Sequence, residues 1–494
     1  SENCEVAPGE MQGFVYSANP SPTTDDNVEV IYGTDISASI EGLEPETTYY
    51  VRAFLTNTIG EFYGDEVSFM TDTGEPADCD IVYLASNGVT IKACSEANLG
   101  DVGVIDGIQY TVVSREMLED LIASGGDLSK ICTTYITNLS GNIDNWQSFF
   151  GSEDGVFDNL NNLYDGQVPS IVSWDVSNVT DMSLMFYLEN SFNQPIGDWD
   201  VSNVTNMQGM FPSSAFNQPI GDWDVSNVTD MKNMFTSTLF NQPIGDWDVS
   251  NVTDMKNMFG YSAFNQPIGD WDVSNVTNMW GMFGNTVFNQ DIGNWDVSSV
   301  TNMSYMFISS VFNRDISNWD VSSVNRMPAM FSGSAFNKPI GDWDVSSVTN
   351  MNSMFGYSVF NQDIGNWNVS NVTYIIGMFE NSVFNQDIGN WDVSNVIHMD
   401  RMFENSVFNQ DIGNWNVSSV NNIYGMFSNT VFNQDISNWD VSSATQMSAM
   451  FLDATAFNQD LSSWVTGNVI YCDEFSDNTP SWTLPQPNFT NCTP

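Results

Sequence analysis

The sequence is poor in positive charge. It has 10 Lys and Arg residues against 62 Asp and Glu, a single histidine, and a formal net charge of −52. A protein that binds nucleic acid needs a basic surface facing the phosphates, so this composition excludes nucleic acid as a partner. Salt screens the repulsion between the many negative charges and makes such an excess tolerable, so we expect a marine or otherwise salty habitat.

Long apolar runs are also missing. No stretch approaches the length of about 20 apolar residues that a membrane-spanning helix needs, and the sequence predicts no transmembrane segment. The chain begins at Ser1 rather than at Met, from which we expect that a signal peptide has been removed, although a cut chain would look the same. Both points favour an extracellular or cell-surface location.

Cysteines are few and widely spaced. There are six, and no Cys-x-x-Cys pair or nearby His supports metal ligation, so in an extracellular protein they predict disulfides. Cys79 with Cys94 and Cys472 with Cys492 are the candidate pairs, which leaves Cys4 and Cys132. The sequence alone does not choose among the possible pairings.

The sequence offers no catalytic constellation. It has no nucleophile motif, phosphate-binding glycine loop or metalloenzyme motif, and its carboxylates are too many to single out an acid and a base. His398 stands where other repeats have Asn or Asp, which indicates a surface substitution rather than a catalytic base. We predict that the protein is not an enzyme and has no cofactor, apart from the Ca²⁺ considered below.

What the sequence does have is a repeat. A marker tryptophan recurs twelve times after Trp174, ten times at an interval of 24 residues and at each end once at 25. A fixed period of this length indicates stacked units that bury their apolar sides against one another, and 24 residues fit one coil of a solenoid better than a propeller blade. We expect about 12 to 13 coils.

Each unit contains two apolar patterns. In residues 223–225, Trp and Val alternate with Asp, which predicts a half-buried strand with Trp and Val inside and Asp outside. In residues 228–235, apolar residues recur at three- and four-residue spacing, which predicts one or two turns of helix on the opposite side of the coil. One short strand and one short helix per coil is the plan of a leucine-rich repeat.

The string FNQ-P/D-IG-x-WDVS-x-VT-x-M-x-x-MF resembles the repeat of BspA-like leucine-rich-repeat surface proteins, a type also found in mycoplasma lipoproteins and in secreted proteins of Bacteroidetes. The resemblance covers roughly residues 131–470. It implies an extracellular or surface-attached protein used in adhesion or binding, without enzymatic activity. It supplies no site residues.

The Asp after the marker Trp forms an acidic column. If coils stack at strand spacing, neighbouring carboxylates repel, and the plain interpretation is a solvated acidic face that keeps the protein soluble. The alternative is a row of Ca²⁺ sites, because Ca²⁺ takes several carboxylate and carbonyl oxygens, although no D-x-D-x-D-G loop is present. The candidate metal ligands are Asp175, Asp200, Asp224, Asp248, Asp272 and Asp296.

The N-terminal part is predicted to be a β-sandwich. Residues 14–16, 28–32, 49–54 and 67–70 have strand patterns, residues 42–53 resemble the E–F region of a fibronectin type III domain, and residues 60–69 resemble its last hairpin. The pattern predicts that the domain lacks its first strand. The cause is either an irregular variant or an open edge that a strand from another subunit fills, for which residues 481–489 are a candidate donor weakened by prolines.

The predicted organisation has four parts. Residues 1–73 form the fibronectin type III-like or Ig-like sandwich, and residues 74–173 form an N-terminal cap and a degenerate coil. The cap is expected to contain strands at 81–84, 89–93 and 109–113, a helix at 115–123 and an insertion at 151–170. Residues 174–464 form the leucine-rich-repeat-like solenoid, and residues 465–494 form a C-terminal cap or tail, because terminal repeats need covering. The whole is a mainly β protein with short helices.

Two function classes follow. The first is a structural or adhesive surface protein in which the coils are a rigid spacer, with itself as a partner in a head-to-tail filament. The second is a module that binds a surface glycan or protein through the acidic face, with or without Ca²⁺. Near-identity of the copies favours the first, whereas a run of exposed aromatics on the strand face would favour the second.

Overall fold

The computed structural model describes residues 11–31, 47–57, 60–71, 78–141 and 169–494, together with residues 38, 40, 43, 75 and 76. The described chain is mainly β and contains one α-helix. Contacts divide the protein into two compact units. The first comprises Ser1–Ser114, Ser129–Tyr135 and Ser173–Asp175, and the second comprises Arg115–Leu128, Ile136–Val172 and Val176–Pro494.

The first unit begins with a four-stranded antiparallel sheet in the order β2-β1-β3-β4. Its strands are β1 Met11–Ser17, β2 Asn27–Ile31, β3 Thr48–Asn57 and β4 Gly60–Met70. All four predicted strands are confirmed, and β3 and β4 pair from Thr48 with Met70 to Asn57 with Gly60, with one register shift between Arg52 and Phe54. The part of residues 11–71 that the structure describes holds this one layer, so the two-layer sandwich is not confirmed.

Five short strands follow in the same unit. β5 Val82–Leu84 pairs with β6 Ile91–Ala93, and β7 Val102–Ile105, β8 Ile108–Val112 and β9 Ile131–Cys132 form a second sheet. The prediction found β5, β6 and β8 but missed β7 and β9. β7 contains Gly103, where an added Cβ would lie 2.4 Å from Val82, so close packing requires the glycine that weakens the strand pattern.

The second unit opens with the helix α1 Arg115–Ala123, which has the predicted bounds and buries Leu118 and Ile122. A short 3₁₀ helix, η1 Leu128–Lys130, lies between the two units in sequence. The predicted insertion at 151–170 falls outside the described residues except for its last two positions. From residue 171 the structure is continuous to the C-terminus.

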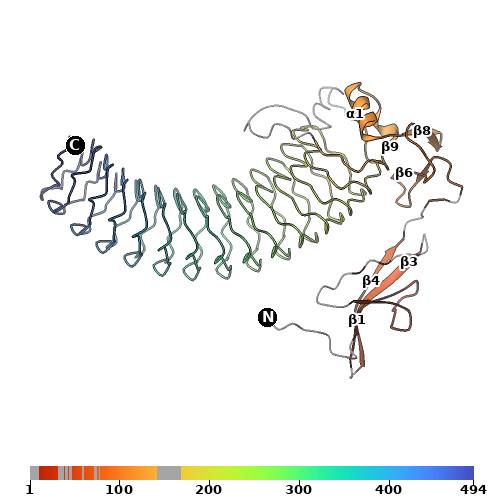
Figure 1. Ribbon diagram of the computed structural model, residues 1–494, viewed down its shortest axis with the longest axis horizontal. Coiled ribbons are helices and arrows are strands. Elements are labelled where there is room, and N and C mark those ends of the chain that lie inside the picture. Colours follow the sequence, from red (N-terminus) through yellow and green to blue (C-terminus); the bar gives the residue numbers. More distant parts are fainter. Residues whose placement is uncertain are drawn as a thin grey trace. The chain divides into compact units, whose positions relative to one another are not determined.

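The repeats of the second unit form a stack of coils, which Figure 1 shows side by side from yellow through green to blue. Each coil pairs with the next at a single parallel bridge, from Asn138 with Asp181 to Gln446 with Tyr471. Hydrogen bonds extend the pairing over eight residues. The N–H groups of residues 231, 233, 235 and 237 donate to carbonyls of residues 254, 256, 258 and 260 in the next coil.

This hydrogen-bonded ladder lies on the side of the coil where the sequence predicted a helix. The segment 231–237 is instead a series of turns, and Asn233 and Ser237 have φ angles of 58°. Such left-handed residues end a helix, and here each turn directs the next N–H toward the neighbouring coil. The predicted helix is therefore wrong, since turns satisfy the same three- and four-residue spacing of Met and Phe.

The predicted strand around the marker Trp is also wrong, because in the described coils residues such as 223–225 belong to no bridge or sheet. The inward and outward directions are confirmed: Trp223 and Val225 are buried and Asp224 is exposed. Alternation shows which side chains are buried but does not show whether the backbone pairs. Side chains hold the coils together on this side.

Buried aromatic columns run through the stack. Within one coil the rings of Phe235 and Phe240 are 4.2 Å apart, and Phe235 lies 5.8 Å from Phe259 of the next coil. The marker tryptophans stack in the same way, with 6.4 Å between Trp319 and Trp343. The Met and Phe columns are thus core, as predicted, and each coil completes the core of its neighbours.

The C-terminal segment caps the stack. Trp482 packs 4.7 Å from Phe457, its Nε1 donates to the Gln459 carbonyl, and Phe489 lies 4.9 Å from Phe475. The predicted donor segment 481–489 is thus paired with the last coil of its own chain. This covers apolar surface that a further coil would otherwise cover.

Candidate functional site

The outward side of the ladder is the surface that differs from coil to coil. We call it the ladder face and define it by five positions: the bridge residue and the second, third, sixth and seventh residues after it. In the eleven coils with bridge residues 206 to 446, nine residue types occur two residues after the bridge residue, whereas the marker position is always Trp. Variation is therefore concentrated on one surface.

Exposed aromatic and basic side chains gather on this face. Every tyrosine between residues 171 and 494, the one tryptophan of the coils outside the marker column, and four basic residues occupy ladder-face positions. They are Tyr187, Tyr261, Tyr305, Tyr357, Tyr374, Tyr424, Tyr471, Trp280, Lys232, Lys256, Arg326 and Arg401. Large aromatic and Arg side chains are typical of recognition surfaces, and a solvated face under no constraint does not need them.

Contacts join the five positions into one surface. Lys256 Nζ lies 4.9 Å from the centre of the Trp280 ring, and that ring lies 5.3 Å from Tyr305. Farther along, the Tyr357 hydroxyl donates to Glu380 Oε1 at 2.6 Å. These contacts cross from one coil to the next, so the face is continuous along the stack.

The densest group of such contacts surrounds the single histidine. We call it the Asp400 cluster, and it consists of Tyr374, Glu380, His398, Asp400, Arg401, Glu404 and Tyr424. The Tyr374 and His398 rings stack 5.7 Å apart, the Arg401 guanidinium lies 5.3 Å from the centre of the Tyr424 ring, and Arg401 Nε lies 3.4 Å from Glu404 Oε2. Aromatic, cationic and anionic groups meet here on adjacent coils.

Two carboxylates of the cluster are poorly satisfied. Asp400 Oδ1 and Glu404 Oε2 are buried atoms without a hydrogen-bond partner, and His398 Nδ1 lies 3.8 Å from Asp400 Oδ1, too far for a hydrogen bond. Burial raises the pKa of the Asp400 carboxyl and of the Glu404 carboxyl. Buried carboxyl groups with raised pKa values are typical of functional sites.

The acidic column predicted as a Ca²⁺ site has a local structural role. Asp224 Oδ1 accepts hydrogen bonds from the N–H and Oγ of Ser226, a turn that most of these aspartates repeat. Asp200, Asp248, Asp272 and Asp296 are likewise exposed and bonded to the Ser two residues on. The Ser298 hydroxyl and N–H lower the pKa of Asp296, which keeps that carboxylate ionised.

Asp175 differs from the rest of the column. It belongs to the first unit, is buried, and accepts a hydrogen bond of 2.6 Å from Thr134 Oγ1. No three of the predicted Asp ligands lie within 4.8 Å of one another in the described part of the chain. The column geometry is therefore explained by turns, and Ca²⁺ binding stays a prediction.

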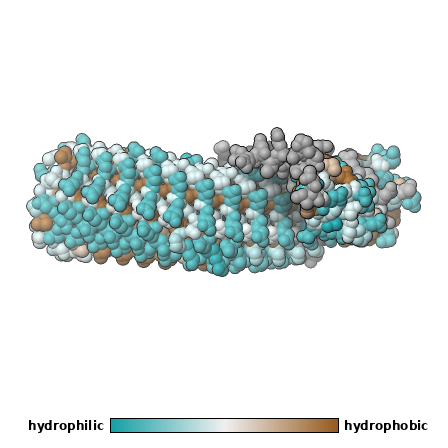
Figure 2. Space-filling model, turned by 90° about the horizontal axis from the view of Figure 1, so that it is seen from below, coloured by the Kyte–Doolittle hydropathy of each residue, from teal (hydrophilic) through white to brown (hydrophobic). Residues whose placement is uncertain are grey.

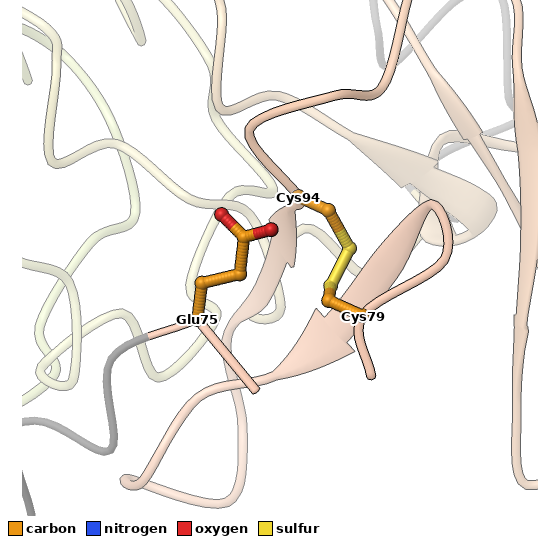
Figure 3. A group of neighbouring side chains, drawn as sticks. All are labelled: Glu75, Cys79 and Cys94. Carbon is orange, nitrogen blue, oxygen red and sulfur yellow. A yellow bond between two sulfur atoms is a disulfide. The ribbon is translucent and has the colours of Figure 1, made fainter. Parts of the chain in front are cut away.

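Both candidate disulfides are present, Cys79–Cys94 and Cys472–Cys492. Figure 3 shows Glu75 beside the first of them, and among the described residues these three are the one group with metal-ligand proximity. The bonded sulfurs offer no thiolate, and Glu75 accepts hydrogen bonds from the N–H and Oγ of Ser95, so the group is structural. Cys132 is buried and free, and Cys4 lies outside the described residues.

A second exposed apolar feature lies beside the ladder face. The residue before the second Phe of most repeats is aliphatic and 47–70% exposed, and we call this row the valine column: Leu239, Val287, Val311, Val359, Val383, Val407 and Val431. Figure 2 shows one side of the molecule, mostly hydrophilic, with a row of hydrophobic patches along the coils. The side chains of the column are small and nearly uniform, which suits solvated positions next to a core.

The stacked coils define the class of the protein, a repeat protein whose units share one continuous core. The chain belongs to the DUF285 family, described as Mycoplasma protein of unknown function. Four overlapping matches run from residue 152 to residue 484, which is more than half of the chain: 152–263, 237–338, 308–407 and 381–484. No curated protein and no solved structure matches the chain.

Sequence reasoning missed the ladder face because it assigned that side of the coil to a helix. A signal was nevertheless available. Aligning the copies shows that Trp280 and Tyr424 interrupt a mostly polar column, and that Tyr305 and Arg401 interrupt a column that is otherwise small or Asn. His398, interpreted as a surface substitution, is indeed partly exposed, but it belongs to the Asp400 cluster. Among the described residues no helix is long and apolar enough to cross a membrane.

Proposed function

We propose that this chain is an extracellular adhesive protein whose coils form a leucine-rich-repeat-like solenoid and whose ladder face recognises a partner. The observation that carries the proposal is the gathering of exposed aromatic residues on a surface whose residues vary from coil to coil. Exposed aromatics on the strand face were the feature expected to favour a binding function. The hydrogen-bonded face is the side that has them, rather than the side with the Asp column.

The rest of the molecule fits a rigid support. A continuous Phe column joins the coils to their neighbours, marker tryptophans stack over part of the array, and a disulfide and a Trp482-centred cluster cover the C-terminal end. Two disulfides favour an oxidising, extracellular location. The antiparallel order β2-β1-β3-β4 is compatible with one sheet of a fibronectin type III-like domain, and surface proteins of the BspA-like type remain the proposed relatives.

The proposed role needs no catalysis, and its partner is a surface glycan or protein. The filament alternative has less support, because segment 481–489 already pairs with its own last coil. Light scattering with and without Ca²⁺ tests that alternative. Large assemblies in solution would support the filament, loss of those assemblies on chelation would assign them to the acidic column, and a monomer would remove the filament hypothesis.

Tyrosine substitutions on the ladder face test the binding function. Tyr261 and Tyr357 are 63% and 60% exposed, and Ser213, Ser237 and Ser309 occupy the same position in other coils. We expect the double variant Tyr261→Ser, Tyr357→Ser to fold normally. Retention on a panel of printed glycans, immobilised matrix proteins and bacterial cells should fall at least about fivefold, since exposed aromatics contribute much of an interface's energy.

A valine-column variant is the matched control. Val383→Ala also removes exposed apolar surface, and Ala263 and Ala335 show that the position accepts alanine. Its retention should equal that of the unchanged chain. The proposal fails if the panel retains no chain at all, or if the tyrosine variant and the control are retained alike.

A further inference from the structure

We propose that the Asp400 cluster binds a basic segment of a partner protein and seats a Lys or Arg side chain against the Asp400 carboxylate. This inference rests on the proposed function and names the chemistry of the partner at one place on the ladder face. A cation suits the site because the Asp400 side chain is 18% exposed and no cation of the described chain lies within hydrogen-bond distance of its Oδ1, so a charged hydrogen bond from a partner would stabilise the carboxylate.

The charges inside the cluster do not neutralise one another. Glu380, Asp400 and Glu404 are three carboxylates, and Arg401 is the one permanent cation, so the local balance is −2. Arg401 is already held by Glu404 on one side and by the Tyr424 ring on the other. It therefore supports the site and makes no hydrogen bond to Asp400 Oδ1.

The residues beside Arg401 in the adjacent coils are small. Gly377 and Gly425 occupy the position of Arg401 one coil before and one coil after it. A Cβ at Gly425 would lie 3.6 Å from Arg401 Cγ, and a Cβ at Gly377 would lie 2.9 Å from Glu380 Oε2. Small neighbours let the guanidinium lie across the next coil to reach Tyr424.

Aromatic rings border the carboxylates. Tyr374 is 37% exposed and stacks on His398, and Tyr424 lies on the next coil. Tyrosine rings attract Lys and Arg side chains through cation–π contact, and Tyr is enriched at the centres of protein interfaces. The net charge of −52 adds a long-range field that draws basic partners and repels acidic ones.

A metal ion fits this cluster less well than an organic cation. Within the described residues, Asp400, Glu404 and Glu380 do not come within 4.8 Å of one another as a group of three. A divalent ion needs several oxygens converging at about 2.3 Å, whereas a guanidinium or ammonium can use one carboxylate and an aromatic face. A neutral sugar would use the rings but would leave the charge of Asp400 uncompensated.

The single histidine provides the readout. His398 is the only histidine of the chain, so its Cε1–H gives one proton NMR signal that reports on this cluster alone. The probes are the peptide acetyl-Gly-Arg-Gly-Arg-Gly-amide and the same peptide with Gln in place of Arg. We expect the arginine peptide to shift the signal saturably, and the glutamine peptide to leave it in place.

Two charge-matched variants make the test specific. Asp400→Asn introduces the residue that Asn352 has at this position, and Asp392→Asn introduces the residue that Asn368 and Asn416 have in the acidic column. Each removes one negative charge from the chain. Asp400→Asn should weaken binding of the arginine peptide about tenfold, because losing one partner of a charged pair costs that much affinity or more. Asp392→Asn should change the affinity by no more than about twofold.

Three results would overturn the inference. Equal weakening by both variants would show diffuse attraction to an acidic surface, and no shift with the arginine peptide would show no cation site. A shift with cellotetraose or mannotetraose instead would identify a glycan site. The last result would leave the proposed function intact, whereas failure of the tyrosine test described above would remove the proposed function itself.

Discussion

The ladder face and the opposite side of the same coils are held together in different ways. On the ladder face, neighbouring coils are joined by backbone N–H and carbonyl groups, which every residue except proline provides. On the opposite side, they are joined by side chains: Trp223 Nε1 donates to the Ile196 carbonyl, and Asn217 Oδ1 accepts the Asn241 N–H. Residue identity is therefore more restricted on the opposite side than on the ladder face.

This difference explains the pattern of the repeat. Asn227 Nδ2 donates to the Ser202 carbonyl and Thr229 Oγ1 to the Thr205 carbonyl, and the same bonds recur in other coils. A substitution at such a position leaves a polar group unpaired, which costs about 1–3 kcal/mol. No such cost applies to the outward ladder positions, so they can acquire Trp, Tyr, Arg and His without loss of the fold.

A core substitution is expected to have the largest effect. Trp319→Ala removes a ring that stacks on Trp295 and Trp343 and a donor to the Ile292 carbonyl. We expect a loss of about 3–5 kcal/mol in the free energy of unfolding, measured by urea denaturation. The control is Tyr374→Asn, for which Asn350 is the precedent, and it should change stability by no more than about 0.5 kcal/mol. Similar losses of stability for Trp319→Ala and Tyr374→Asn would contradict the difference between the core and the ladder face.

A polar substitution on the side opposite the ladder face is expected to have an intermediate effect on stability. Asn361 Oδ1 accepts hydrogen bonds from the Asn385 N–H and from Gln386 Nε2, at 2.9 and 3.1 Å. Asn361→Ala removes both and should cost about 1–3 kcal/mol. Hydrogen exchange of the amides around residue 385 should accelerate locally, because each coil contacts only its neighbours. Exchange that is unchanged at residue 385 would show that the side-chain ladder contributes little.

The smallest effect on stability is expected for Asp400→Asn, which should stabilise the protein rather than destabilise it. Burial raises the pKa of the folded Asp400 carboxyl above its ordinary value of 3.8. The folded state is therefore penalised once the pH rises from 3.8 through the raised pKa, and the penalty is absent below that window. Asp400→Asn should match the unchanged chain at acid pH and be slightly more stable at neutral pH, as melting temperatures across pH would show. A variant that is less stable at neutral pH would mean that the carboxylate has an internal partner.

The sequence predicted more of the architecture than of the site. The Trp period and the inward Met and Phe residues fixed the coils and their core, and α1 was predicted with its observed bounds. The ladder was placed on the wrong side because burial periodicity reports side-chain direction, whereas left-handed residues such as Asn233 and Ser237 decide where the backbone pairs. Any residue can adopt this conformation when turns impose it, so it leaves little trace in sequence.

The site was missed for a related reason. The Asp400 cluster unites residues from coils whose contacts depend on the ladder geometry, such as Arg401 with Tyr424 and Tyr374 with His398. When the paired strand is assigned to the acidic column, Asp224 and its equivalents become the candidate metal ligands. The structure shows that serine turns account for those carboxylates.

The most direct test exchanges the ladder-face residues of one coil for those of another. Asp400→Tyr, Arg401→Gly and Glu404→Ser give the coil of His398 the ladder residues of the next coil at three positions, and they keep His398 as the NMR probe of peptide binding. The free energy of unfolding, measured in urea, should stay within about 2 kcal/mol of the unchanged chain, while binding of the arginine peptide disappears. A loss of stability as large as that of Trp319→Ala, with binding retained, would contradict the division of the coil into a folding side and a recognition side.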